Sequence, residues 1–131
     1  MRVVGILLAA GALVLVGCSH TQPIHNVQNA PFVLPSGKSL TMSDASKAIT
    51  QAGKSLGWQM EAAAPGLLSG RLALRSHVAV IDVEHDTKSY SIKYRDSTNL
   101  EEKDGTIHKA YNEWIENLDK AIRNQAQLVA R

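Results

Sequence analysis

A group of short polar side chains and one histidine lies where the last predicted strand, a loop and the last predicted helix follow one another. The group consists of Ser97, Asn99, His108 and Asn112. Serine and asparagine side chains donate and accept hydrogen bonds, and histidine also exchanges a proton near neutral pH. If these three segments converge, the four residues form a candidate site for a small ligand. The alternative is that they satisfy loop backbone groups and cap the helix, as short polar side chains commonly do.

His108 also raises the question of hydrolysis. A serine hydrolase needs a nucleophile, a base and an orienting acid within mutual reach. Ser97 and His108, with Asp96 or Asp104, supply these residue types. The Gly-x-Ser-x-Gly turn that exposes a serine nucleophile is absent from the sequence. We therefore expect no enzymatic activity, and hydrolysis through His108 is kept as the last alternative.

Neither metal nor nucleic-acid binding is indicated. The sequence contains no His-Glu-x-x-His motif, no glycine-rich phosphate loop and no calcium loop. His77 and His85 stand at opposite ends of one predicted strand, about 26 Å apart at the usual rise. The chain has 14 basic and 12 acidic residues, a net charge of +2, and so lacks the basic excess of a nucleic-acid binder. We expect no metal, no cofactor and no nucleic-acid partner.

The first residues have the features of an export signal. Met1-Arg2 precedes an uncharged run, residues 3–16, that is shorter than the roughly 20 apolar residues of a membrane-spanning helix. The run ends in Leu15-Val16-Gly17-Cys18, which contains the only cysteine of the chain, so no disulfide can form within it. This tetrad resembles the lipobox of bacterial lipoproteins. The alternative is a buried cysteine at the end of an ordinary signal peptide or anchor helix.

The resemblance implies a covalent anchor. In such lipoproteins a diacylglyceryl group is attached to the cysteine thiol, the signal is cut just before that residue, and the new amino terminus is acylated. Here this means removal of residues 1–17 and lipidation of Cys18, with more than one chain to hold the protein stably on a membrane. Ser19 stands where an aspartate favours retention at the inner membrane. The resemblance therefore implies the outer membrane of a two-membrane bacterium, on its periplasmic face.

Periodicity divides the remaining residues into a tether and one domain. Residues 18–40 are polar, contain Pro23, Pro31 and Pro35 and show no regular period, which predicts a flexible lipidated tether. With 44% hydrophobic and 20% charged residues overall, the chain has the composition of a folded protein. Residues 41–131 are therefore expected to form one globular domain.

Two helices and four strands are expected in that domain. Apolar residues at helical spacing predict helices over 43–56 and about 106–129. Period-2 alternation with short connections predicts four strands, within 58–62, 68–75, 79–84 and 90–95. Such strands form an antiparallel meander, and both helices bury their apolar stripes on one face of it. The expected fold is a two-layer α+β domain of the order α-β-β-β-β-α.

The other face of the expected sheet carries outward side chains of both charges, namely Arg71, Arg75, Asp82, Glu84, Lys93 and Arg95. Such a face is typical of a solvated surface. The alternative is a docking face for a periplasmic partner, and an uncapped sheet edge can also accept an added strand.

A second resemblance covers residues 90–100 and 107–115 together with Gly57-Trp58 and Pro65-Gly66. These segments are similar to a pattern in small proteobacterial lipoproteins of unassigned function, and the similarity implies no catalytic residue. The sequence thus predicts a lipid-anchored accessory or protein-interaction module of the cell envelope. Small-ligand binding in the periplasm is the alternative.

Overall fold

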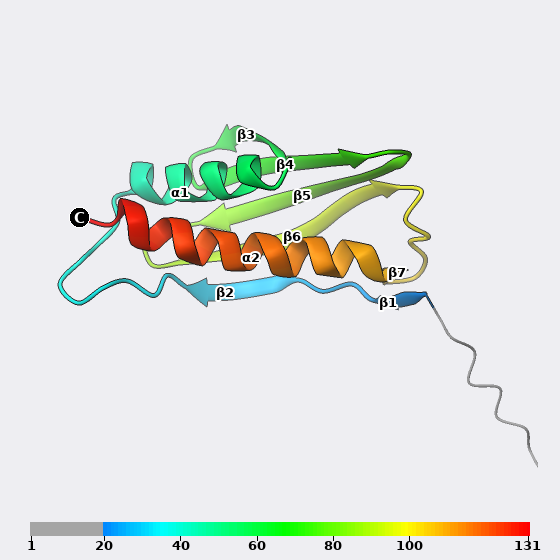
Figure 1. Cartoon of the computed structure of the whole chain (residues 1–131), viewed down its shortest axis with the longest axis horizontal. Coiled ribbons are helices and arrows are strands. Elements are labelled where there is room, and N and C mark those ends of the chain that lie inside the picture. The colour runs from blue at the N-terminus through cyan, green and yellow to red at the C-terminus, as the bar shows by residue number, and fades with distance from the viewer. Residues whose placement is uncertain (1–19) are drawn as a thin grey trace, which may run out of the picture.

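A computed structural model describes residues 20–131, and the expected signal peptide, Cys18 and Ser19 lie outside this range. The described residues form two helices and seven strands along one elongated body (Figure 1). In chain order the elements are β1 (Thr21–Pro23), β2 (Val27–Pro31), α1 (Met42–Ser55), β3 (Gln59–Ala64), β4 (Leu67–Leu74), β5 (His77–His85), β6 (Ser89–Thr98), β7 (Thr106–His108) and α2 (Lys109–Val129). Within 20–131, neither helix has an apolar stretch that would cross a bilayer.

The α+β class with an antiparallel sheet and two helices is confirmed, but the expectation of a four-stranded sheet is wrong. The main sheet has five strands in the order β2-β6-β5-β4-β3, and β1 and β7 form a separate two-stranded sheet. β3 to β6 follow one another as antiparallel neighbours, as the alternation predicted. The fifth strand, β2, extends this sheet beyond β6.

β2 is not visible in the sequence because its alternation is broken. Its pairing with β6 shifts between Val27 and Ala30, and Asn29 between them has a left-handed φ of 48°. A bulge of this kind places an extra residue in the strand and destroys the period of two. Pro31 at its end also lowers the strand propensity of the segment.

The expectation that residues 18–40 form a flexible tether is wrong for the described part, residues 20–40. Besides forming β1 and β2, this segment buries Val27, Phe32 and Leu40 in the core. The Phe32 ring lies 5.0 Å from that of Tyr90, centroid to centroid. Three apolar residues spread over a polar stretch give no periodic signal, yet each of them fills the core. Residues 20–40 are therefore part of the domain.

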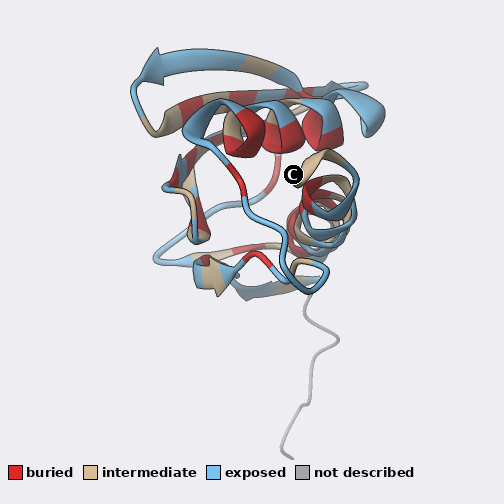
Figure 2. Ribbon diagram, turned by 90° about the vertical axis from the view of Figure 1, so that its left-hand side faces the viewer, coloured by how far each residue is buried: buried red, intermediate tan, exposed pale blue. Residues whose placement is uncertain are grey.

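The sheet curves around the two helices, and the buried residues lie on the surfaces that face each other (Figure 2). α1 buries its small stripe of Ala45, Ala48, Ile49 and Ala52, which lets it pack closely against α2. α2 buries Tyr111, Ile115, Leu118, Ile122 and Ala126. Trp114, Ala121 and Val129, which lie beside this stripe, are only half-buried. The helix begins at Lys109 instead of about 106 because residues 106–108 pair with β1.

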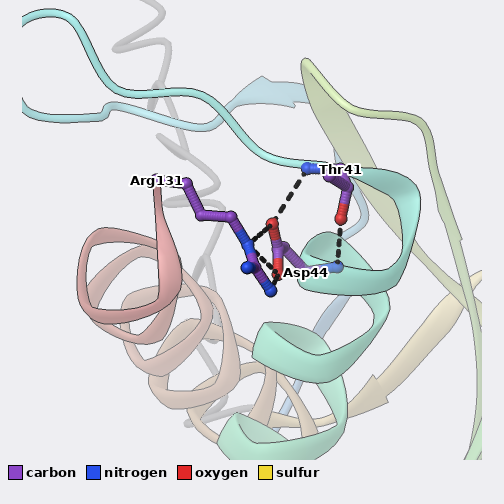
Figure 3. A network of polar contacts seen from close by, with 3 residues as sticks. All are labelled: Thr41, Asp44 and Arg131. Carbon is purple, nitrogen blue, oxygen red and sulfur yellow. Dashed lines mark hydrogen bonds and ion pairs between the residues drawn. The ribbon is translucent and has the colours of Figure 1, made fainter.

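A polar network fixes the start of α1 against the end of the described chain (Figure 3). Thr41 and Asp44 form a capping box, in which each side chain accepts a hydrogen bond from the other residue's backbone N–H. Arg131 donates two hydrogen bonds to Asp44 through Nε, at 3.2 and 3.0 Å, and a third through a terminal nitrogen. The Arg131 guanidinium, with the Thr41 N–H, lowers the pKa of Asp44 to about 2. This network holds the first turn of α1 in place beside the end of α2.

Candidate functional site

The four predicted ligand residues lie near one end of the molecule, but they do not bind one another. The Ser97 hydroxyl is hydrogen-bonded to the Tyr94 hydroxyl at 2.8 Å. Asn99 has a left-handed φ of 57° and donates its amide to the Ser76 hydroxyl at 2.8 Å. Ser97 is thus bonded within β6, whereas Asn99 joins the β6–β7 connection to the β4–β5 connection.

His108 and Asn112 hold the N-terminal segment and the start of α2. His108 is the N-cap, and its Nδ1 accepts a hydrogen bond from the Ala110 N–H at 3.1 Å. This nitrogen is therefore not free to act as a general base. The buried Asn112 accepts from the His25 N–H at 3.0 Å and donates to the Pro23 carbonyl and the Gln22 side chain. The geometry thus gives all four predicted residues structural partners, and a ligand site there remains a prediction.

A hollow with a volume of about 870 Å³ lies elsewhere, between α1 and β3. We call it the α1–β3 groove. The polar side of α1 forms one wall, β3 forms the other, and the Pro65–Gly66 turn and His85 close one end. Its lining residues are Ser43, Ser46, Lys47, Thr50, Gln51, Lys54, Met60, Ala62, Ala63, Ala64, Pro65, Gly66, Leu67, Leu68 and His85.

β3 is an edge strand along this groove. It stands last in the sheet order, and β4 is the only segment within residues 20–131 that is hydrogen-bonded to it. Five of its six residues are exposed. A free edge presents unpaired backbone N–H and C=O groups, which pair readily with another extended chain. A register shift between Ala62 and Ala64 leaves the main run, from Gln59 to Ala62, regularly paired with β4.

The charges along the groove have one sign. Lys47 and Lys54, two helical turns apart on α1, line it, and its walls contain no carboxylate. Glu61 instead lines a small hollow with Arg71 elsewhere on the sheet. An occupant with negative charge is therefore favoured over a positive one, because the ammonium groups would otherwise repel it.

A serine and a histidine form the closed end of the groove. The Ser46 hydroxyl lies 2.8 Å from Nε2 of His85, and Nδ1 of His85 lies 3.2 Å from the Asp86 carbonyl oxygen. Because a carbonyl only accepts, Nδ1 of His85 donates to the Asp86 carbonyl oxygen. A serine beside a histidine supplies two of the three groups of a catalytic triad. Here a backbone carbonyl stands where the triad has an orienting carboxylate. The pair therefore serves first to attach α1 to the end of β5.

The turn beside His85 requires a glycine. Gly66 has a φ of 74°, which L-residues rarely adopt, and a Cβ there would lie 2.8 Å from the His85 carbonyl oxygen. Pro65-Gly66 connects β3 to β4. Proline followed by a left-handed glycine is typical of a type II turn.

Sequence reasoning did not single out the residues of this groove. His85 continues the alternation of Ala79, Ile81 and Val83, all of them buried, so its burial could have been expected from the period of two. The groove itself depends on which strand lies at the edge of the sheet and on where α1 crosses the sheet. Local residue periodicity predicts neither. Within residues 20–131, no group of three or more histidine, cysteine or acidic side chains is placed to hold a metal ion.

No family model, curated protein or solved structure matches this chain.

Proposed function

We propose that this protein is a lipid-anchored lipoprotein of the cell envelope and a non-enzymatic module that binds a protein partner. The chain would be anchored through Cys18 to the outer membrane, facing the periplasm. Support for the anchor comes from the lipobox-like tetrad and from Ser19 after it. Support for the binding role comes from the fold, as follows.

The observation that carries the proposal is the free edge of β3 beside two lysines. An extended segment that adds to a sheet edge gains main-chain hydrogen bonds, while side-chain contacts decide which segment binds. In the α1–β3 groove a bound segment would lie between β3 and α1. Lys47 and Lys54 would then face its side chains, so the partner is an extended segment rich in aspartate or glutamate.

Peptide binding followed by NMR tests this proposal. The probe is a peptide of about nine residues, long enough for one strand, in which valine and aspartate alternate. We expect it to shift the backbone amide signals of residues 59–64. A version with lysine in place of aspartate, and one with a central proline, should cause no shift. Equal binding of all three peptides, or shifts confined to other elements, would refute strand addition at β3.

Charge reversal on α1 supplies the matched variants. Lys47→Glu and Lys54→Glu should each abolish binding of the acidic peptide, because attraction becomes repulsion at the groove wall. Lys120→Glu is the control, since Lys120 is exposed on α2 and does not line the groove. All three residues are exposed on helix surfaces, so the thermal midpoints of the variants should stay close to that of the parent protein.

The volume of the groove favours a second candidate function, binding of a small anionic ligand. About 870 Å³ falls within the usual range for ligand sites. A small polycarboxylate such as citrate would contact the lysines of α1 without hydrogen bonding to β3. This function would be favoured if citrate shifts the backbone amide signals of α1 alone and the acidic peptide shifts none of the amide signals of β3.

The anchor is tested separately by mass spectrometry of the membrane-bound protein. We expect residues 1–17 to be missing and Cys18 to carry acyl chains. Cys18→Ser should leave an unprocessed or soluble product. An unmodified Cys18 thiol on the native protein would refute the anchor and would leave the proposed binding role of the α1–β3 groove unaffected.

A further inference from the structure

We infer that the domain sits directly on the lipid headgroups by one particular end, with the α1–β3 groove directed away from the membrane. This inference rests on the proposed lipidation of Cys18. We call the surface the anchor end: it consists of His20, the first turn of α2, the loop 99–105 and the tip of the β4–β5 hairpin at Arg75–Ser76. The chain enters the fold at this end (Figure 1).

The first step is that the anchor end is one connected surface. The Leu100 carbonyl accepts from the His108 N–H at 2.8 Å, which joins the loop to α2. Asn99 joins the same loop to the hairpin, through the Ser76 hydroxyl at 2.8 Å and through its own carbonyl to His77 Nδ1 at 2.7 Å. Loop, hairpin tip and helix start therefore move as a unit.

The second step is that backbone hydrogen bonds fix the chain where it enters this surface. The His20 carbonyl accepts from the Lys109 N–H at 2.9 Å, and β1 pairs with β7 directly afterwards. The Ile24 N–H then donates to the Gly105 carbonyl at 2.9 Å. A flexible tether of 23 residues, as first expected, would have an end-to-end distance of roughly 26 Å. The fold instead fixes every residue from His20 onward.

The third step is a distance set by covalent geometry. Cys18 is two residues before His20, so the two residues lie at most about 7 Å apart. Each headgroup layer of a bilayer is itself roughly 5–8 Å thick. Acyl chains on Cys18 must lie in the hydrocarbon, so His20 and its neighbours lie at the level of the headgroups.

The residues of the anchor end suit that position. The loop and the hairpin tip expose side chains of both charges, among them Arg75, Glu101, Glu102, Lys103 and Asp104. Such groups pair with zwitterionic headgroups and do not enter hydrocarbon. The occupant of this surface is therefore a zwitterionic lipid surface, held there by the covalent anchor more than by affinity of its own.

The opposite end carries the closed end of the groove. α2 has 21 residues and leads about 30 Å away from the anchor end. Arg131 follows its end and binds Asp44 in the first turn of α1, next to Ser43 and Ser46 of the groove. The groove residues Ser43 and Ser46 are thus held away from the headgroups, in the part of the domain farther from the membrane.

Fluorescence quenching by lipid headgroups tests this orientation. The full lipidated protein is reconstituted in phosphatidylethanolamine–phosphatidylcholine vesicles that contain a lipid with a spin label on its headgroup. Because Cys18 is the only cysteine and would be acylated, a cysteine introduced elsewhere is the only free thiol for a fluorophore. The exposed sites are Glu102→Cys at the anchor end, Lys120→Cys within α2 and Gln127→Cys near its far end.

We expect near-complete loss of emission at position 102, a partial loss at 120 and none at 127. Ten glycine and serine residues inserted between Ser19 and His20 should make the three losses similar. Equal losses without the insertion, or the reverse order, would overturn the inference. Flotation with the vesicles and the mass of Cys18 are measured on the same samples. A protein that does not float refutes the anchor itself, whereas a floating protein with equal losses refutes only the orientation.

Discussion

At the scale of single residues, two buried tyrosines differ in what their hydroxyl groups contact. The Tyr90 hydroxyl donates to the Asp119 carboxylate, whereas the buried Tyr111 hydroxyl has no hydrogen-bond partner among the described residues. Burial raises the pKa of both phenols, and the Asp119 carboxylate adds to this at Tyr90. The two side chains therefore offer a direct comparison of a satisfied and an unsatisfied buried polar group.

Removing the hydroxyl of Tyr90 should lower the stability of the fold, whereas removing that of Tyr111 should not. Tyr111→Phe keeps the edge-to-face packing on Tyr94, at 5.6 Å between centroids, and should leave stability unchanged or raise it by about 1 kcal/mol. Tyr90→Phe loses a hydrogen bond to a charged group and should cost about 2 kcal/mol. Urea unfolding of both variants measures the two changes. A loss at Tyr111 as large as that at Tyr90 would mean that its hydroxyl has a partner in solution.

The lowered pKa of Asp44 predicts that the folded protein loses stability in acid. Its pKa is lowered from 3.8 to about 2, chiefly by the hydrogen bonds from Arg131. A carboxyl whose pKa is lower in the folded state stabilises that state above its unfolded pKa, and this contribution disappears as pH falls through the folded value. The free energy of unfolding should therefore drop between about pH 4 and pH 2.

Asp44→Asn isolates this contribution. The variant should be less stable than the parent at neutral pH, and the difference should shrink as pH falls from about 4 to 2. Urea unfolding at a series of pH values measures it. A difference that stays constant down to pH 2 would show that Arg131 does not hold this carboxylate in solution.

Gly66 combines a backbone and a steric requirement. Gly66→Ala forces a left-handed φ on a residue with a Cβ and places that Cβ against the His85 carbonyl, so it should cost more than about 1 kcal/mol. Gly37→Ala is the control, because Gly37 has a φ of 76° but no atom within 4 Å of a built Cβ. Thermal unfolding should show a larger loss at Gly66. Equal losses of stability in the two variants would show that the left-handed φ, and not the contact with the His85 carbonyl, is what requires glycine at position 66.

At the scale of elements, β2 and the segment after it decide whether residues 20–40 belong to the domain. Phe32→Ala removes a ring that is 8% exposed and contacts Tyr90, and it should cost about 3–5 kcal/mol. A tether would predict no effect. Val33→Ala is the neighbouring control, since Val33 is 58% exposed and should change stability by no more than about 0.5 kcal/mol. Denaturant unfolding of both variants gives the comparison.

The sequence predicts elements well where one period runs without interruption. The helix expected over 43–56 is α1 at Met42–Ser55, and the four expected strands match β3 to β6. Prediction fails where an element is completed by distant residues. β2 depends on a bulge at Asn29, and the start of α2 is moved to Lys109 because β1 pairs with residues 106–108. Neither condition has a local signal.

The site was predicted less well than the fold, for the same reason. Ser97, Asn99, His108 and Asn112 are polar and close in sequence, but each is used to hold a connection or a strand. The α1–β3 groove arises from sheet order and from the position of α1. Its residues had been read as a helix surface and as a strand, and only the edge position of β3 gives them a common role.

At the scale of the whole molecule, the described chain is arranged between two ends. His20 and the start of α2 meet at one end, and Asp44 meets Arg131 at the other. The segment between β1 and α1 runs the length of the body, as Figure 1 shows. The proposed anchor and the proposed binding groove are thus separated by a rigid body, which sets how far from the membrane a partner is held.

The pairing of early with late segments has a consequence for how the protein acquires its structure. Asn112 bonds to residues 87 to 90 positions before it, and Asp44 bonds to a residue 87 positions after it. Contacts of such large sequence separation slow folding, because a long loop must close before they form. While the ribosome is still making α2, Arg131 is not yet available to the first turn of α1. The network at Asp44 therefore closes late in synthesis; for the export proposed above, such late closure would keep part of the chain unfolded during translocation.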